Sequence, residues 1–152
     1  MDDAPFPRLA VRALILHRDR LLLVNAWPAA KSDLMCAPGG GVQRGQSLPD
    51  TLIREVFEET GLAITVGAPC LVNEFHDPGG TFHQVDVYFR CTLSGAATLD
   101  PDWQDVDAIV TDRRWVSRAE MGGIRVKPDS VAAVAWEDTG AITYDPLEPL
   151  VR

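Results

Sequence analysis

The sequence has no long hydrophobic run, which excludes a membrane-spanning helix. Uninterrupted apolar stretches, such as residues 13–16 and 131–135, are far shorter than the roughly 20 residues that cross a bilayer as a helix. The start of the chain, MDDAPFPR, is acidic and lacks the basic segment followed by a hydrophobic segment that marks a secretory signal. We therefore expect no membrane partner and a cytoplasmic location.

Cysteine and basic residues are also scarce. The three cysteines, Cys36, Cys70 and Cys91, form no CxxC pair and have no histidine at zinc-finger spacing, so we expect reduced and buried thiols. The chain carries 14 lysine and arginine residues against 22 acidic residues, a formal net charge of −8. Binding to DNA or RNA needs clustered basic residues, so this balance argues against a nucleic-acid partner. An anionic substrate would need a cation of its own.

The remaining composition is that of one globular domain. Hydrophobic residues make up 46% of the 152 residues and charged residues 24%, as in ordinary folded proteins. No internal repeat, low-complexity tract or linker-like stretch interrupts the chain. We therefore expect a single domain over residues 1–152, long enough to bury an ordinary core.

Hydrophobic periodicity and turn residues predict strands that alternate with helices. Residues 26–41, which end in Pro-Gly-Gly-Gly, are expected to form a loop. Residues 85–89 alternate apolar and polar side chains, the pattern of a half-buried strand. The strands are expected at residues 9–17, 21–25, 63–66, 71–75, 82–93 and 109–116, and the helices between Ser47 and Gly61, directly after Ser117, and at 129–138. This order implies an α/β or α+β fold with a mixed sheet.

The helix after the glycine tract is expected to be amphipathic. Apolar residues recur at helical spacing along it and predict one face packed on the core. These residues are Leu48, Leu52, Ile53, Val56 and Phe57.

An acidic group lies on the same helix. Glu55, Glu58 and Glu59 occupy positions i, i+3 and i+4, which places three carboxylates on one side. Like charges at this spacing repel each other, and the C-terminal turn of a helix disfavours anions. A solvated acidic face is one interpretation. The glycine tract before the helix and Arg54 beside the carboxylates favour another, in which a divalent cation supplies the missing counter-charge.

These residues lie within a stretch that resembles a known family motif. From Gly40 to Leu62 the sequence reads GGVQRGQSLPDTLIREVFEETGL, which resembles the Nudix box, GX5EX7REUXEEXGU, where U is a bulky aliphatic residue. All specified positions fit except one, because Gln46 stands where the box has its first glutamate. An amide brings no negative charge and takes up no proton at neutral pH.

The resemblance implies a fold, an activity and a set of site residues. The fold would be an α/β/α sandwich with a mixed sheet, and residues 40–62 would form the Nudix box. The activity would be hydrolysis of a pyrophosphate bond in a nucleoside diphosphate linked to another group, such as a nucleotide, a sugar or ADP-ribose, with Mg²⁺ or Mn²⁺ as cofactor. By similarity, the metal ligands would be the Gly40 carbonyl, Glu55, Glu58 and Glu59. The catalytic residues would be Arg54, Glu55 and Glu58, with Glu55 as a ligand or as the base and Arg54 orienting it.

Gln46 leaves a second function open. A noncatalytic nucleotide-binding or regulatory domain would keep the fold with a weakened metal site. A plain globular domain with an acidic helix face is a third interpretation. A P-loop is excluded, because no Gly-Lys-Ser/Thr follows the glycine tract.

A further carboxylate is expected beyond the box. The Nudix family often draws one from a later loop, and Asp100, Asp102, Asp105 and Asp107 cluster at a suitable distance. Asp105 and Asp107 precede the strand that contains Trp115, as such residues commonly do. A solvated acidic loop is the alternative interpretation, and the sequence does not select among the four.

Other residues are candidates for substrate contacts. Trp27 and Trp103 could stack on a nucleobase, and His83 could contact a phosphate, although packing or a surface position also accounts for each of them. The apolar positions of residues 9–25 could form a homodimer interface. The group linked to the nucleoside diphosphate is left open.

Overall fold

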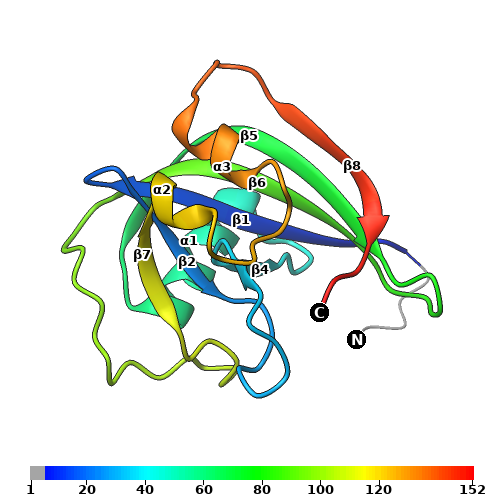
Figure 1. Cartoon of the computed structure of the whole chain (residues 1–152), viewed down its shortest axis with the longest axis horizontal. Coiled ribbons are helices and arrows are strands. Elements are labelled where there is room, and N and C mark those ends of the chain that lie inside the picture. Colours follow the sequence, from blue (N-terminus) through cyan, green and yellow to red (C-terminus); the bar gives the residue numbers. More distant parts are fainter. Residues whose placement is uncertain (1–5) are drawn as a thin grey trace.

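The computed structural model describes residues 6–152, so the expectation drawn from residues 1–5 lies outside the described part of the chain. Within residues 6–152 there are eight strands and three helices (Figure 1). The strands are β1 (Arg8–His17), β2 (Arg20–Asn25), β3 (Met35–Cys36), β4 (Gly39–Gly41), β5 (Ile64–His76), β6 (His83–Leu93), β7 (Arg113–Ser117) and β8 (Thr143–Pro149). The helices are α1 (Leu48–Thr60), α2 (Arg118–Met121) and α3 (Val131–Trp136). None of these helices has the length and apolar character needed to cross a bilayer.

The strands form one mixed sheet, as predicted. Its order is β3-β2-β1-β6-β5-β8, with β4 added to β1 and β7 added to β2. The pairs β1–β6 and β5–β8 are parallel, and the other pairs are antiparallel. Strand β1 is central because β6 pairs with it on one side while β4 and β2 share its other side.

Both faces of the sheet are covered, which confirms the expected α/β/α sandwich. Along β1, Val11, Ala13 and Ile15 pack with α1, whereas Leu14 belongs to a separate cluster with α3. The side chains of a strand alternate between its two faces, so one strand supplies both cores. Figure 1 shows α1 on one side of the sheet and α2 and α3 on the other.

Local sequence signals for turns and caps are confirmed. The turn between β1 and β2 has positive φ at Arg18 and Asp19, the conformation that suits a tight hairpin. The Ser47 side chain caps the start of α1, and Gly61 ends it with a φ of 75°. The helix expected directly after Ser117 is α2, and Ser117 forms a capping box with Glu120 at its start.

Two apolar residues of α1 were wrongly expected in the core. Ile53 and Phe57 are 40% and 49% exposed, whereas Leu52 and Val56 are fully buried. Only one narrow stripe of α1 contacts the sheet. Ile53 and Phe57 each follow a buried residue of that stripe, and one step along a helix turns a side chain by about 100° around the helix axis.

Several strand predictions also need correction. The segment 26–41 is not all loop, because the glycine tract forms β4, where a Cβ at Gly39 would collide with the Val11 carbonyl of β1. The strands expected at 63–66 and 71–75 are one bulged strand, β5. The strand expected at 109–116 begins only at residue 113, and the last helix ends well before Gly140. Strand β8 was not foreseen, since its two prolines suit only the edge of a sheet.

Candidate functional site

A cleft of about 960 Å³ opens over the sheet, between β4, the ends of β5 and β6, the loop of residues 105–110 and the C-terminal segment. The charged residues that line it are Arg8, Arg12, Lys31, Lys127 and Arg152 together with Glu55, Glu59, Asp86, Asp105, Asp107 and Glu148. Five of the chain's 14 basic residues therefore gather at one cleft. Six acidic residues line the same cleft, so an anionic ligand there would need a cation beside the carboxylates as well as these basic side chains.

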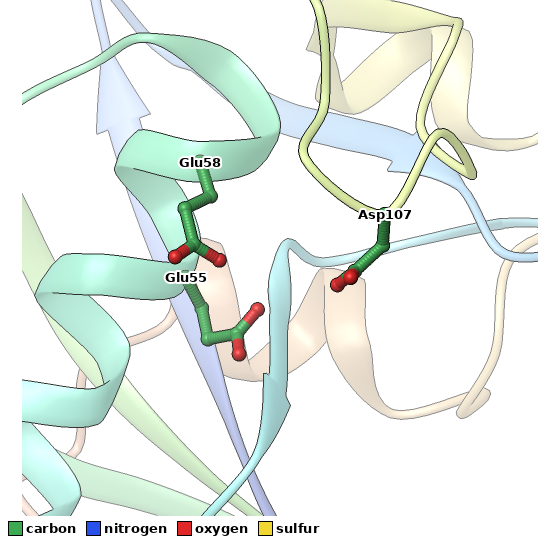
Figure 2. A group of neighbouring side chains, drawn as sticks. All are labelled: Glu55, Glu58 and Asp107. Carbon is green, nitrogen blue, oxygen red and sulfur yellow. The ribbon is translucent and has the colours of Figure 1, made fainter.

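Three carboxylates converge beside the cleft. Glu55 and Glu58 of α1 meet Asp107 of the later loop, and one oxygen from each lies within 4.8 Å of the others. Figure 2 shows the three side chains directed toward one another from the two segments. Oxygen donors from separate elements that meet in this way are typical of sites for hard divalent cations.

The structure selects Asp107 among the four late aspartates. Asp105 holds the loop, because its Oδ2 accepts hydrogen bonds from the amides of Ile109 (3.2 Å) and Val110 (2.8 Å). Its Oδ1 accepts from the Asp107 amide at 3.2 Å, which sets the position of that residue. Asp100 accepts a bond from the amide of Asp102 in an exposed turn away from the group.

Gly40 lies directly against Glu55. A Cβ at position 40 would stand 2.6 Å from the Glu55 carboxyl carbon and from its Oε2. Only a glycine leaves room for this carboxylate beside β4. The absence of a Cβ at Gly40 therefore allows the Glu55 carboxylate to lie where it does. The glycine-rich motif does not reveal this role by itself.

One guanidinium orients the carboxylates of α1. Arg54 Nη1 donates to Glu55 Oε1 at 3.1 Å and to Glu58 Oε2 at 3.3 Å, which confirms the expected Arg54–Glu55 hydrogen bond. Arg54 Nη2 donates to the amide oxygen of Gln46 at 3.1 Å. The residue that departs from the box therefore supports Arg54 and is not one of the three converging acids.

Glu59 is turned aside from that group. Its Oε2 accepts from the Gly39 amide at 3.3 Å, and its side chain is buried beside β4. Burial raises its pKa to about 8, although Arg12 and the Gly39 amide act in the opposite direction. Glu59 therefore contacts β4 at Gly39, next to the contact of Glu55 with Gly40, whereas Glu55 and Glu58 meet Asp107.

The electrostatics of the converging acids also fit a cation. Burial raises the pKa of Glu55, and Arg54 only partly offsets this effect. A partly buried carboxylate with a raised pKa, such as Glu55, lacks sufficient counter-charge, and a divalent cation would supply it. The donors are all oxygen atoms, so the residues fit Mg²⁺ or Mn²⁺.

The two tryptophan candidates occupy different positions relative to the cleft. Trp27 lines the cleft, donates from Nε1 to the Val151 carbonyl at 3.0 Å and lies 5.2 Å from the Arg152 guanidinium. Trp103 lies outside the cleft lining, where its indole donates to the Glu58 carbonyl at 2.9 Å and its ring meets Phe57 edge-on. It packs on the end of α1, and its contact with a nucleobase stays a prediction.

His83 also lies outside the cleft lining. It lies at the start of β6, and its Nε2 is 3.5 Å from Oε2 of Glu74 on β5. The neighbouring Phe82 and Gln84 line the cleft instead. The contact between His83 and a substrate phosphate stays a prediction.

Sequence reasoning missed a row of buried polar residues on the floor of the cleft. Asp86 was expected on a solvent face but is only 3% exposed, because the sheet is covered on both faces. Gln84 Nε2 donates to Asp86 Oδ1 at 2.7 Å, and Gln84 Oε1 accepts from Arg8 Nη1 at 2.8 Å. Arg12 Nε lies 3.6 Å from Asp86 Oδ2. Polar residues inside an otherwise apolar strand were the available signal.

Comparison with known proteins identifies the family. A family model described as the NUDIX domain matches residues 6–137, most of the chain. The chain belongs to the Nudix family. The Nudix box predicted at residues 40–62 therefore coincides with the segment that carries two of the three converging acids.

Relatives and solved structures agree with this assignment. A mouse (Mus musculus) protein named nucleoside diphosphate-linked moiety X motif 6 is 32% identical over 85 residues, 56% of this chain and 25% of that protein. The match thus spans about a quarter of that relative's length. A structure titled UDP-X diphosphatase has a TM-score of 0.71 at 18% identity, covering 95% of this chain and 68% of that one. A NUDIX hydrolase from Nitrosomonas europaea has a TM-score of 0.69 at 22% identity, covering 85% and 86%. These structures share the fold.

Proposed function

We propose that this Nudix chain is a Mg²⁺- or Mn²⁺-dependent hydrolase that cleaves the pyrophosphate bond of a nucleoside diphosphate linked to another group. The observation that carries the proposal is the convergence of Glu55, Glu58 and Asp107 beside a cleft that gathers basic residues. A polyanionic substrate suits such a cleft, since the basic side chains attract it and a cation shields it from the carboxylates.

The same residues form the proposed metal site. Glu55, Glu58 and Asp107 would hold the ion, with the Gly40 carbonyl and Glu59 as further ligands from the β4 side. A bound divalent cation would neutralise phosphate charge and make the phosphorus easier to attack by water. The donor set supports this assignment, because every side-chain donor is a carboxylate oxygen.

The chain's own residues supply orientation and proton transfer. Arg54 holds Glu55 and Glu58 in place through hydrogen bonds of 3.1 and 3.3 Å. Burial raises the pKa of Glu55, which makes its carboxylate a better proton acceptor than an exposed one. Glu55 would therefore accept a proton from the attacking water or act as a metal ligand. Trp27 is the aromatic side chain that we propose to contact the substrate.

Gln46 motivates the alternative of a noncatalytic nucleotide-binding or regulatory domain. Its amide oxygen bonds Arg54 and Thr51 and is not among the three converging acids. The departure from the box thus leaves the main carboxylates intact, which favours an active enzyme. A Gln46→Glu variant that converted an inert protein into a hydrolase would support the regulatory alternative for the natural chain.

The decisive experiment is a hydrolysis screen with the whole chain. Nucleoside diphosphates linked to sugars, nucleotides or ribose are incubated with Mg²⁺ or Mn²⁺, and the released mononucleotide is measured. We expect at least one compound to be cleaved and Glu58→Gln to lose about 100-fold or more in kcat/KM. Asp102→Asn is the matched control, because Asp102 is exposed and outside the converging group. Absence of metal-dependent cleavage for every compound would refute the proposal.

Other expectations remain proposals. Strand β8 lies beyond the matched region and pairs with β5, which supports a single domain over residues 1–152. A cytoplasmic location and a homodimer stay predictions.

A further inference from the structure

One buried side-chain nitrogen on the floor of the cleft has no hydrogen-bond partner among the described residues. Asn73 of β5 is 2% exposed and lines the cleft, yet its amide nitrogen makes no hydrogen bond with any described residue. A buried donor without a partner is unfavourable, and native proteins contain few of them. His83 is the other described side chain with such an atom, and it lies outside the cleft lining.

The acidic residues on either side of Asn73 already have other partners, and on the β8 side Asp145 accepts a hydrogen bond from Ser130 Oγ at 2.6 Å. Asp86 lies directly opposite Asn73 on β6, but its two oxygens face Gln84 and Arg12. Gln84 in turn accepts from Arg8. This network occupies the polar groups of Asp86 and Gln84 and leaves the Asn73 amide nitrogen available to a ligand.

An aromatic surface lies next to that amide. Phe75, two residues along β5, shares the face of Asn73, because side chains alternate along a strand. Its ring centroid lies 5.8 Å from that of Phe82, and both residues line the cleft. A flat apolar ring with a polar edge would match this surface and the neighbouring amide together.

Asn73 lies at a distance from the acidic group that suits the nucleoside end of a nucleotide whose phosphate lies at that group. Gly41, Ala10, Asp86 and Asn73 occupy one continuous row across β4, β1, β6 and β5. Three strand spacings separate the ends of this row, about 14 Å. Gly40, next to the start of the row, contacts Glu55. A ligand whose phosphate lies at the acidic group would therefore extend its nucleoside toward Asn73.

We propose that Asn73 is a specificity-determining residue whose amide nitrogen donates a hydrogen bond to an acceptor atom of the substrate's nucleobase. This inference rests on the proposed function for the direction of the substrate in the cleft. The base would lie against Phe75 and Phe82, and the phosphate groups would lie toward Glu55. Asn73 thus distinguishes ligands by their base and leaves the phosphate end unaffected.

The test measures binding of ligands that have no pyrophosphate bond, so it does not depend on turnover. Titration calorimetry in the presence of Mn²⁺ compares the four nucleoside 5′-monophosphates with ribose 5-phosphate, which lacks the base. We expect at least one nucleotide to bind the natural chain more tightly than ribose 5-phosphate does. Asn73→Leu should weaken that nucleotide by about 10-fold or more and leave ribose 5-phosphate unchanged. Unchanged binding of ribose 5-phosphate also shows that the variant is folded.

Two further variants sharpen the result. Asn73→Asp keeps the shape of the side chain but removes the donor, so it should lose nucleotide affinity as Asn73→Leu does; wild-type affinity in Asn73→Asp would overturn the inference. Thr65→Ala, at an exposed position of the same strand, is the matched control and should bind as the natural chain does.

The outcomes separate this inference from the proposed function. Equal binding of nucleotides and ribose 5-phosphate, or an equal loss of both in Asn73→Leu, would overturn the role of Asn73 even in an active hydrolase. Base-dependent binding that is lost in Asn73→Leu would support it even if no compound in the hydrolysis screen were cleaved.

Discussion

Gly40→Ala is expected to damage the metal site without damaging the fold. The φ angle of Gly40 is outside the left-handed region, so the backbone accepts an alanine. The added Cβ would stand 2.6 Å from the Glu55 carboxyl carbon, where ordinary contacts begin at 3.4 Å. The carboxylate must therefore retreat by about 1 Å, within the range where misplacement costs a catalytic site about 100-fold.

The size of the effect on metal binding follows from the same displacement. A disturbed ligand shell lowers metal affinity by about 10- to 100-fold. This loss removes about 1.4 to 2.7 kcal/mol of the stability that saturating Mn²⁺ adds. For a chain of this length each kcal/mol corresponds to about 2–4 °C in Tm. The rise in Tm caused by Mn²⁺ should therefore be about 3–11 °C smaller in Gly40→Ala.

The assay is thermal unfolding with and without Mn²⁺, followed by circular dichroism. Gly122→Ala is the control, because Gly122 has a helical φ of −64° and a Cβ there would meet nothing within 4 Å. The control should show the same Mn²⁺-induced rise in Tm as the natural chain. A Gly40→Ala protein with an undiminished rise and undiminished hydrolysis would refute the role assigned to the Gly40–Glu55 contact.

Three other predictions concern the residues around the site. Asp105→Ala removes the acceptor of three loop amides, so it should lower the free energy of unfolding by about 1–3 kcal/mol and weaken Mn²⁺ binding. Urea titration measures the first effect and calorimetry the second. No change in either quantity would contradict the prediction. Burial raises the pKa of Glu59 from 4.5 to about 8, so the unfolded chain releases the Glu59 proton at a lower pH than the folded chain does. The free energy of unfolding without metal should therefore fall as the pH rises from 4.5 to about 8. Glu59→Gln should flatten that slope in Tm measured with EDTA, and an identical slope would contradict the prediction. Gly61→Ala should cost more than about 1 kcal/mol, because φ is 75° and the Cβ would stand 2.9 Å from the Trp103 ring; a wild-type Tm would contradict this.

The helix and its chemistry could be predicted from the sequence because they depend on neighbours along the chain. Ser47 and Gly61 mark the two ends of α1, and both act through backbone groups a few residues away. Glu58 lies four residues after Arg54 and three after Glu55, so its carboxylate is within reach of both side chains on any helix. The box spacing therefore identified the acidic helix before any tertiary contact was known.

Only the tertiary structure decided which distant residues complete the site. Asp107 and Asp105 are two positions apart and have the same chemistry. The loop directs Asp107 toward Glu58, whereas Asp105 stabilises the loop by accepting hydrogen bonds from its amides. Trp27 and Trp103 look alike in sequence, yet only one lines the cleft. Asn73 reads as an ordinary polar residue until the sheet is seen to be covered on both faces. Local patterns specify which way a side chain points relative to its own strand or helix, whereas its neighbours across the fold depend on how the elements pack.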